Sequence, residues 1–426
     1  MSLPRSLRSL ISTALVMALA PLAGAAVWIV DDDGGPGVHF TDLNAAVAAA
    51  AAGDTILVAP GTYASGSVFI DKPLRILGTG ADPYDVYLLA APPIVEVRNV
   101  AGSDPVVLSN VSGASRMEVW DCDAPVVLID VALAVRAYAS RDVRLHGMQG
   151  PVYSPLDAFA LSGSRLEAVG CDFQGSAGSP ANCVGGGGTG GPGLAIGASR
   201  AHLSACTSTG GPGGYLGCST SFGYGGDGGS GISMQSSTLV LAGAPDSFVA
   251  GGDGGGAFSG FCSFVGYGGT GLSASNSVIL YSSTAFQGGP PGAPCTSSSL
   301  AGAATSLSGT GGLLPVSPAQ PRLELLGTPG PGATVTLRTH APAGADVTVF
   351  LGRTAIVQPE PGIEVEQLCD RLRAYHLGQV PVGKTVDHVV LLPAWMTPGD
   401  CLFAQAQVRL RTGERFNTNS IPIVAR

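Results

Sequence analysis

Charged side chains are scarce in this chain of 426 residues, where Asp, Glu, Lys and Arg together make up 12% of the sequence. That share is about half of what soluble domains usually carry. Helical bundles need charged faces toward the solvent, whereas short strands joined by Gly, Ser and Thr turns do not. The scarcity of charge therefore disfavours a helical fold and favours an all-β chain.

Positive charge is the scarcer sign, with 21 basic residues against 30 acidic residues and a net charge of −9. Two of the basic residues, Arg5 and Arg8, lie in the first 25 residues, so the rest of the chain is more acidic still. An acidic chain is repelled by polyanions. The balance of charge excludes nucleic acid and anionic membrane surfaces as partners.

Long apolar runs are absent beyond the N-terminus, so the sequence predicts no membrane span in the mature chain. The N-terminus has the three parts of a secretory signal over residues 1–25. These are the basic Arg5 and Arg8, an apolar core from Leu10 to Ala20, and the small residues Ala23-Gly24-Ala25. We expect a secreted protein of the extracellular space or cell envelope, with cysteines that are able to pair.

Glycine, by contrast, is abundant at 64 residues, about twice the usual share. Hydrophobic residues still make up 45% of the chain, and the mean hydropathy is +0.33. These values exclude a disordered glycine-rich polymer.

A repeated unit organises residues 115–314. The pairs Ser115-Arg116, Ser164-Arg165 and Ser199-Arg200 are each followed, six residues after the Arg, by a cysteine. A further copy starts at Ser140-Arg141 and is slipped by about one residue. A period of this length predicts stacked coils, each covering the apolar face of the next, and we interpret the array as a right-handed parallel β-helix.

Apolar and polar residues alternate within each copy, as in strands with one buried face. The apolar set is expected inside the coils and the polar set outside. The alignment of the copies gives one inner and one outer column: Val119, Ala168 and Leu203 inside, and Glu118, Glu167 and His202 outside.

The N-terminal coil carries the most specific pattern. Thr41 is expected to cap a helix over residues 42–52, which Gly53 ends. The segments GDTILVAPGTY (53–63) and IDKPLRILG (70–78) follow. At these residues the chain resembles the pectin-lyase-like parallel β-helix family, in particular its secreted bacterial members. The resemblance implies a rod over residues 26–314 whose open N-terminal end is capped by the helix.

From Phe173 onward each coil carries a long glycine-rich excursion. Each excursion returns to the stack through a Gly followed by apolar residues, as at Gly193-Leu194. Because Gly lets backbone pass close to backbone, the excursions are expected to lie stacked on one side of the rod.

The C-terminal quarter has a different texture. Residues 315–321 are interpreted as a Pro-rich linker. Alternating runs punctuated by turn signals then predict a small antiparallel β-sandwich over residues 322–426.

The nine cysteines contain no CxxC pair, so no zinc site is predicted. An equal spacing in two consecutive coils suggests one disulfide per coil, tying the strand end to its excursion. The alternative is a ladder in which Cys171 bonds Cys206, because stacked strands lie within disulfide range. The first scheme leaves Cys122 over and pairs Cys171 with Cys183, Cys206 with Cys218, Cys262 with Cys295, and Cys369 with Cys401.

Metal and phosphate sites have weak signals. Asp31-Asp32-Asp33 offers hard ligands for Ca²⁺, but adjacent side chains on an extended segment point opposite ways, which favours a polar turn. The Gly-Asp runs at 225–231 and 251–254 lack the second Asp of calcium-binding repeats, and no Gly-Lys-Ser/Thr follows any Gly run. No metal or cofactor is therefore predicted.

The resemblance raises the catalytic groups of β-helix enzymes that act on uronic-acid polymers. The Asn-Thr-Asp and Arg-Ile-Lys of the hydrolases are absent, and the one His-Gly is His146-Gly147. Asp82-Pro83-Tyr84-Asp85 resembles an epimerase motif, but a Pro turn is expected there anyway. A lyase would need a base near acidic Ca²⁺ ligands, for which the candidates are Arg116, Arg141 and Arg144 near Asp121, Asp123 and Asp142.

The structural alternative for the Arg residues is a solvated position at the strand entry. The six histidines show no i, i+4 pairing and are interpreted as surface residues: His39, His146, His202, His340, His376 and His388. Aromatics make up 6% of the chain, and a sugar-binding face has four candidates, whose alternative role is loop packing: Trp120, Tyr215, Tyr224 and Tyr267.

Two functional hypotheses follow. The first is an exported, non-catalytic β-helix protein with a structural, surface or extracellular role, acting as a monomer with weak contact to polysaccharide or other cell-surface components. The second is a polysaccharide lyase or hydrolase with a divergent site. The missing catalytic triplets and the repetitive outer columns favour the first, because an active site would break the repeat.

Overall fold

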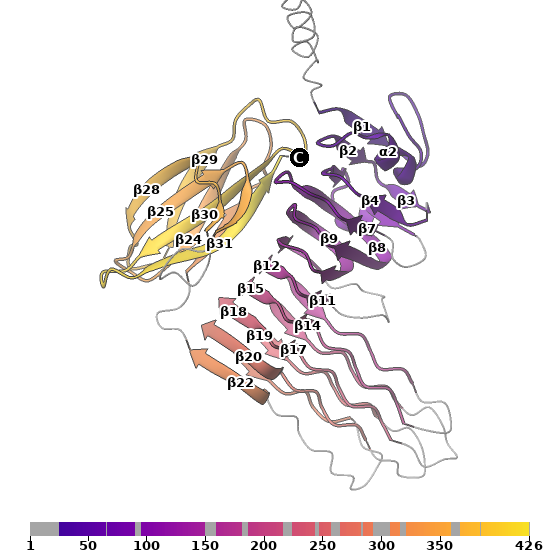
Figure 1. The fold of residues 1–426 in the computed structure, drawn as a ribbon, viewed down its shortest axis with the longest axis vertical. Helices are drawn as coiled ribbons and strands as arrows, with labels where there is room; N and C mark the ends of the chain where they lie inside the picture. The colour runs from indigo at the N-terminus through magenta and orange to yellow at the C-terminus, as the bar shows by residue number, and fades with distance from the viewer. Residues whose placement is uncertain are drawn as a thin grey trace, which may run out of the picture.

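The computed structural model describes residues 25–64, 66–89, 95–149, 159–180, 186–215, 224–242, 247–256, 265–282, 284–292, 307–315, 321–358, 367–383 and 385–425. The expected signal segment and most of the expected linker lie outside these ranges. Figure 1 shows a rod of stacked strands with a separate β-domain beside it.

The rod is a parallel β-helix, as predicted. Its strands form one continuous parallel sheet that wraps around three faces, here called A, B and C in chain order. Strand residues alternate between the interior and the outside, so each face lines one central core of Val, Leu, Ile and Ala. Face A stacks β1 (Val27–Val30), β2 (Thr55–Val58), β5 (Arg75–Gly78), the first parts of β8 (Val106–Trp120) and β9 (Val126–Tyr138), β10 (Val143–His146), β12 (Arg165–Val169), β15 (Arg200–Ser204), β18 (Thr238–Ala242), and the last parts of β20 (Leu272–Ser282) and β22 (Leu307–Pro315).

Faces B and C complete each coil. Face B stacks β3 (Gly61–Tyr63), β6 (Val86–Leu88), the middle of β8 and β9, β13 (Asp172–Gln174), β16 (Thr207–Thr209), β19 (Phe248–Ala250) and β21 (Ala285–Gln287). Face C stacks β4 (Val68–Ile70), β7 (Val95–Arg98), the last parts of β8 and β9, β11 (Phe159–Ser162), β14 (Leu194–Gly197), β17 (Ile232–Gln235), and the first parts of β20 and β22. The glycine-rich excursions leave after the strands of face B and return into the strands of face C.

One predicted register is wrong. Ala168 pairs with Leu203 on face A, as expected, but Val119 pairs with Ala137 on face C. Glu118 is displaced with it, opposite Arg136. The alignment had equated Ser115-Arg116 with the later Ser-Arg pairs, although it lies at the entry to a different face.

The corner between faces C and A is built from a ladder of serines. The backbone N–H of each serine donates to the hydroxyl of the serine on the next coil, at 2.9–3.1 Å. Each hydroxyl in turn donates to the carbonyl two residues before it. Cys122 takes the first position of this ladder, which places Ser140 in register rather than slipped. The serines are Ser140, Ser164, Ser199, Ser237 and Ser277.

We expect Ser199→Ala to destabilise the rod by about 1–3 kcal/mol, because it leaves the buried N–H of Ser164 without an acceptor. Urea unfolding measures the change. Ser233→Ala on β17 is the matched control, since Ser233 is half-buried and lies outside the ladder. Equal stability of the two variants would contradict a structural role for the ladder.

A short helix, α2 (Leu43–Ala49), lies near the N-terminal end of the rod. Its N-cap is Asp42, whose carboxylate accepts from the N–H of Ala45 at 3.0 Å, so the helix starts one residue later than expected and ends earlier. Leu43, Ala46 and Val47 are buried in the core of the rod. A capping role for this helix stays a prediction.

The second domain is an antiparallel β-sandwich with its own core, as predicted. It lies against the outer side of face A (Figure 1). A small apolar cluster joins the two domains, in which Val107 and Val127 of the rod contact Phe403 of the sandwich. One sheet contains β23 (Arg322–Leu326), β24 (Thr334–His340) and β29 (Thr385–Leu391), the second contains β28 (Arg373–Gln379), β25 (Asp346–Gly352), β30 (Cys401–Arg409) and β31 (Arg415–Val424), and a small ribbon pairs β26 (Ala355–Gln358) with β27 (Gln367–Cys369).

Candidate functional sites

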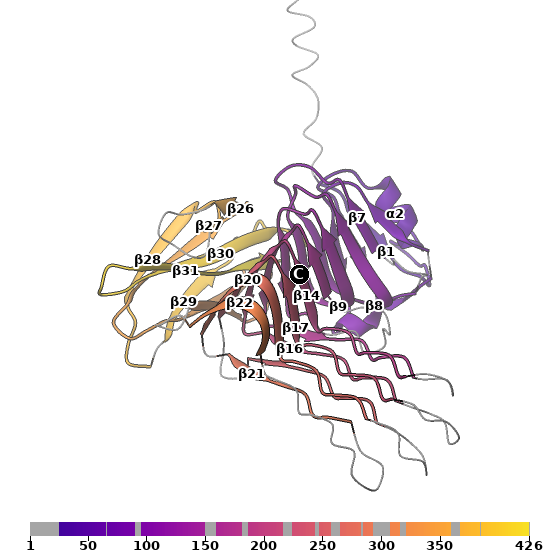
Figure 2. The same ribbon diagram turned by 60° about the horizontal axis from the view of Figure 1, so that its bottom comes forward.

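The excursions lie side by side and project away from the rod (Figures 1 and 2). Their described residues form what we call the glycine blade, which has an outgoing set of chains and a returning set. The outgoing set comprises residues 175–180, 210–215, 251–256 and 288–292, and the returning set comprises residues 186–193, 224–231 and 265–271.

Backbone hydrogen bonds hold the glycine blade together. Within the returning set, the N–H groups of Gly187, Gly190 and Gly193 donate to carbonyls of the next coil at 2.7–3.0 Å, so the bonds recur at every third residue. Other glycines bond across the two sets, as Gly229 does to the carbonyl of Gly211 at 2.8 Å. A polyproline-II chain has three residues per turn and no internal hydrogen bonds, which leaves its backbone groups available for this pairing.

The close approach of these chains requires glycine. A Cβ at Gly229 would lie 2.0 Å from the carbonyl oxygen of Gly191, and one at Gly252 would lie 2.1 Å from that of Gly211. The obstructing atoms are backbone, so no side chain can move aside. The Gly-Asp runs belong to this array rather than to an ion site, and Asp227 accepts a hydrogen bond from the N–H of Tyr267 at 2.8 Å.

Side chains of the glycine blade are confined to its outside. Three candidate tyrosines for sugar contact lie here, and Tyr215, Tyr224 and Tyr267 are 54%, 60% and 57% exposed. The fourth candidate, Trp120, is on face C, where it stacks on Tyr138 at 4.0 Å between ring centroids and donates to Glu118. Trp120 therefore has a packing role, whereas the three tyrosines are available for contact.

The candidate lyase residues are drawn into structural contacts. Arg144 is completely buried beneath the sandwich, so the expected solvated position is wrong for this residue. Its guanidinium donates to Asp142 at 2.7 and 2.9 Å, to the Ser420 hydroxyl at 2.8 Å, and to backbone carbonyls of the sandwich. Arg165 binds the other oxygen of Asp142 at 2.9 Å. Arg116 pairs with Glu118 on face C at 2.7 Å.

A second group of candidates converges beside this buried cluster. Asp123, Arg141 and Asp142 line a cleft of about 360 Å³ between the rod and residues 354–358 of the sandwich. Within the part of the chain that the structure describes, only Asp31, Asp32 and Asp33 gather three metal-competent groups within 4.8 Å. Asp32 there accepts from the N–H of Thr62 at 2.9 Å, as expected of a polar turn.

The epimerase-like segment is likewise a turn. Asp82 and Asp85 close a capping box around the 3₁₀ helix η1 (Pro83–Asp85), in which each carboxylate accepts a backbone N–H. Both carboxylates are thus used in holding the backbone.

Three outer residues of face A are buried titratable groups. Glu167 accepts from the N–H of Ser420, and its second oxygen has no partner among the described residues. Burial raises the pKa of Glu167 to about 7 and lowers the pKa values of His146 and His202 to about 3. The prediction that these two histidines are surface residues is wrong, because the sandwich covers His146 and burial holds both imidazoles neutral.

These pKa shifts predict a pH dependence of stability. Below pH 6.5 the unfolded chain protonates the two histidines and the folded chain does not, so stability falls on acidification. Glu167 acts oppositely, because from pH 7 down to 4.5 only the folded state binds its proton. Each proton is worth about 1.4 kcal/mol per pH unit. Glu167→Gln should therefore lose about 3 kcal/mol more than the wild type between pH 7 and 5, measured by urea unfolding, and equal losses would contradict the shift.

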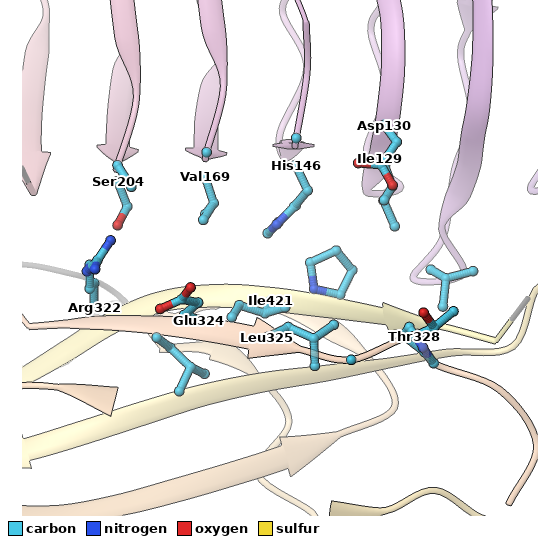
Figure 3. Close-up of a pocket in the computed structure, with 18 residues that line it drawn as sticks. Ile129, Asp130, His146, Val169, Ser204, Arg322, Glu324, Leu325, Thr328 and Ile421 are labelled. Atoms are coloured by element: carbon cyan, nitrogen blue, oxygen red, sulfur yellow. The ribbon is translucent and has the colours of Figure 1, made fainter. Parts of the chain in front are cut away.

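A cavity of about 430 Å³ lies between the ends of the face A strands and β23 (Figure 3). From the rod, Asp130, His146 and Ser204 line it, and from the sandwich come Arg322 and Glu324. Its apolar wall includes Ile129, Val169, Leu325 and Ile421. Sequence reasoning missed this cavity, since its two halves are more than a hundred residues apart and only the docking of the sandwich joins them.

The described cysteines are all free thiols. Cys369 and Cys401 are not bonded, so the predicted bond between them is not formed; Cys369 lies in β27, paired with β26, while Cys401 begins β30, paired with β31. Cys171 and Cys206 are stacked inside the core, where the N–H of Cys171 approaches the Sγ of Cys206 at 3.5 Å. Their predicted partners, and the pair at 262 and 295, lie outside the described residues: Cys183, Cys218, Cys262 and Cys295.

No helix among the described residues is long and apolar enough to cross a membrane.

The chain matches no known family model and no curated protein. Three solved structures are similar to it. They are a DUF3823 family protein from Bacteroides ovatus (17% identity, TM-score 0.20, 28% of this chain and 61% of that chain), the full-length tailspike protein 2 of Escherichia coli O157:H7 bacteriophage CAB120 (13%, 0.27, 86% and 64%), and a pectin methylesterase mutant in complex with a hexasaccharide (12%, 0.19, 60% and 79%). The chain spans less than two thirds of the length of the first two. Likeness at this level says nothing about function.

Proposed function

We propose that this chain is an exported, non-catalytic β-helix protein with a structural role at the cell surface or in the extracellular space. The rod acts as a monomeric support, and the glycine blade is the surface that contacts other components, including glycans. The observation that carries the proposal is the glycine blade itself. It is joined by backbone bonds, projects from the rod, and presents Tyr215, Tyr224 and Tyr267 to solvent.

Rigid exposed tyrosines suit weak contact with sugars. An aromatic ring offers an apolar face and a polar hydroxyl, and a tyrosine loses little conformational entropy on binding. Hydroxyl side chains lie among them on the returning set, where Ser230 and Thr270 contact each other at 2.9 Å. The surface is therefore able to contact both the apolar and the polar faces of a pyranose ring.

Export is supported by the sequence of the first 25 residues, with its basic, apolar and small-residue parts. Cell fractionation of the native host, together with the mass of the purified protein, tests this step. We expect a product that lacks about 25 N-terminal residues and is found outside the cytoplasm. A full-length product confined to the cytoplasm would overturn the proposal.

The second candidate is a polysaccharide lyase or hydrolase, and the cleft formed by Asp123, Arg141 and Asp142 favours it. Asp142 is already bound to Arg144 and Arg165, which supports the non-catalytic role. A uronate-release assay with and without Ca²⁺ decides between the two. Release that is lost in Arg141→Ala would establish the enzyme, and no release is expected.

A glycan array on the mature chain tests the contact surface. We expect weak binding that is lost when Tyr215, Tyr224 and Tyr267 are all replaced by Ser. Replacing Tyr84, which is 42% exposed on the rod, is the matched control. Binding that survives the triple replacement would show that the glycine blade is not the contact surface.

A further inference from the structure

The cavity between face A and the sandwich contains polar atoms that the protein itself does not satisfy. Ser204 is 1% exposed and His146 is 9% exposed, and both line the cavity. The hydroxyl of Ser204 and the Nε2 of His146 have no hydrogen-bond partner among the described residues. Burying such an atom without a partner costs about 1–3 kcal/mol, so these two groups favour an occupant with hydroxyl groups.

The opposite wall supplies charges of both signs. Figure 3 shows the side chain of Arg322 directed toward Ser204, with Glu324 next to it on β23. Both residues are held by His340, which lies 2.8 Å from the carboxylate of Glu324 and 3.2 Å from the guanidinium of Arg322. A cation would be opposed by Arg322 and an anion by Glu324, whereas a neutral molecule with donors and acceptors satisfies both.

The remaining wall is apolar and the cavity is small. Val169, Leu325 and Ile421 provide a surface for C–H groups. A volume of about 430 Å³ lies at the lower end of the range of about 300–1,000 Å³ for small-molecule sites. This size suits a single ring rather than an extended chain.

From this arrangement we infer that the interdomain cavity binds a neutral monosaccharide or a single neutral sugar residue, with Ser204, His146 and Arg322 as its hydrogen-bonding groups. The ring lies against the apolar wall while its hydroxyls reach the polar atoms of both domains. The imidazole of His146 is neutral at pH 7, so it accepts from or donates to a hydroxyl without adding charge. The site is independent of the glycine blade, and because it is shared by two domains its occupant holds them together.

Thermal unfolding and calorimetry of the whole mature chain test the inference, with D-glucose, D-galactose, D-mannose and D-galacturonate as probes. At least one of the neutral hexoses should raise the unfolding temperature, because it binds only the folded state. Ser204→Ala should weaken its binding about 2- to 10-fold, and Arg322→Met, which removes a charged donor, about 10-fold or more. His146→Phe should weaken binding as well.

Matched controls separate this site from general destabilisation. Ser282→Ala changes a buried serine in the same column of face A, and His202→Phe changes a buried histidine on the same strand as Ser204; neither residue lines the cavity. Both controls, and the triple tyrosine replacement in the glycine blade, should leave hexose binding unchanged. The inference is overturned if no neutral hexose binds, if galacturonate alone binds, or if the cavity variants bind hexose as the wild type does.

Discussion

Gly229→Ala should destabilise the glycine blade by about 1–3 kcal/mol or more, the range for overpacking a close-packed interior. The added methyl group would lie 2.0 Å from the carbonyl oxygen of Gly191 on the neighbouring coil. Accommodating it requires the two chains to separate, which breaks the bond from Gly229 to Gly211 and loosens its neighbours. Urea unfolding gives the free energy, and hydrogen exchange of the blade amides shows where protection is lost.

Gly186→Ala is the matched control because Gly186 lies in the same blade. A Cβ there meets its nearest neighbour, the carbonyl oxygen of Tyr224, at 3.6 Å, which is an ordinary contact. Replacing such a glycine by Ala should be neutral or stabilise the fold by about 0.4–1 kcal/mol. If the two replacements have the same effect, the close packing of the glycine blade is contradicted.

Arg144→Ala should cost about 3–5 kcal/mol, because it leaves the carboxylates of Asp142 and Glu167 buried without their cation. Arg144 also contacts the sandwich through Ser420 and two backbone carbonyls, and its guanidinium lies 5.0 Å from the ring centroid of Phe403. The loss should therefore appear as separation of the two domains, followed by limited proteolysis in the sandwich. Chemical unfolding and the proteolysis rate measure the two effects.

Arg338→Ala controls for the loss of an ion pair as such. Arg338 pairs with Asp387 at 2.8 Å on the surface of the sandwich, where such pairs contribute little. We expect its stability to be indistinguishable from that of the wild type. A similar loss in both variants would show that Arg144 does not anchor the interface.

Much of the fold could be predicted from the sequence because its signals are local. The segments at 53–63 and 70–78 indicate the first coils, and the recurring Ser-Arg pairs indicate the stack. The phase was misjudged at Ser115-Arg116, since the same dipeptide occurs at two corners of the coil and only the hydrogen bonds of Ser140 distinguish them.

The outer side of face A could not be predicted in the same way. Arg144, Glu167 and His202 form a polar column that is typical of a solvated surface. They are buried because of the sandwich and its docking, whose contacts are up to 276 residues away in sequence, between Arg144 and Ser420. For the same reason the cavity around His146 and Ser204 has no local signal. The glycine blade did have one, in the Gly-Gly-x spacing of residues 187–193 and 225–231, which matches three residues per turn.

Hydrogen exchange of the wild-type protein, resolved to the peptides that contain residues 187–193 and 225–231, tests the central claim most directly. The account predicts slow exchange of Gly187, Gly190, Gly193 and Gly229, although the blade lies outside the core of the rod, because each N–H is bonded to a neighbouring chain. Exchange of these amides at the rate of an unstructured chain would contradict it.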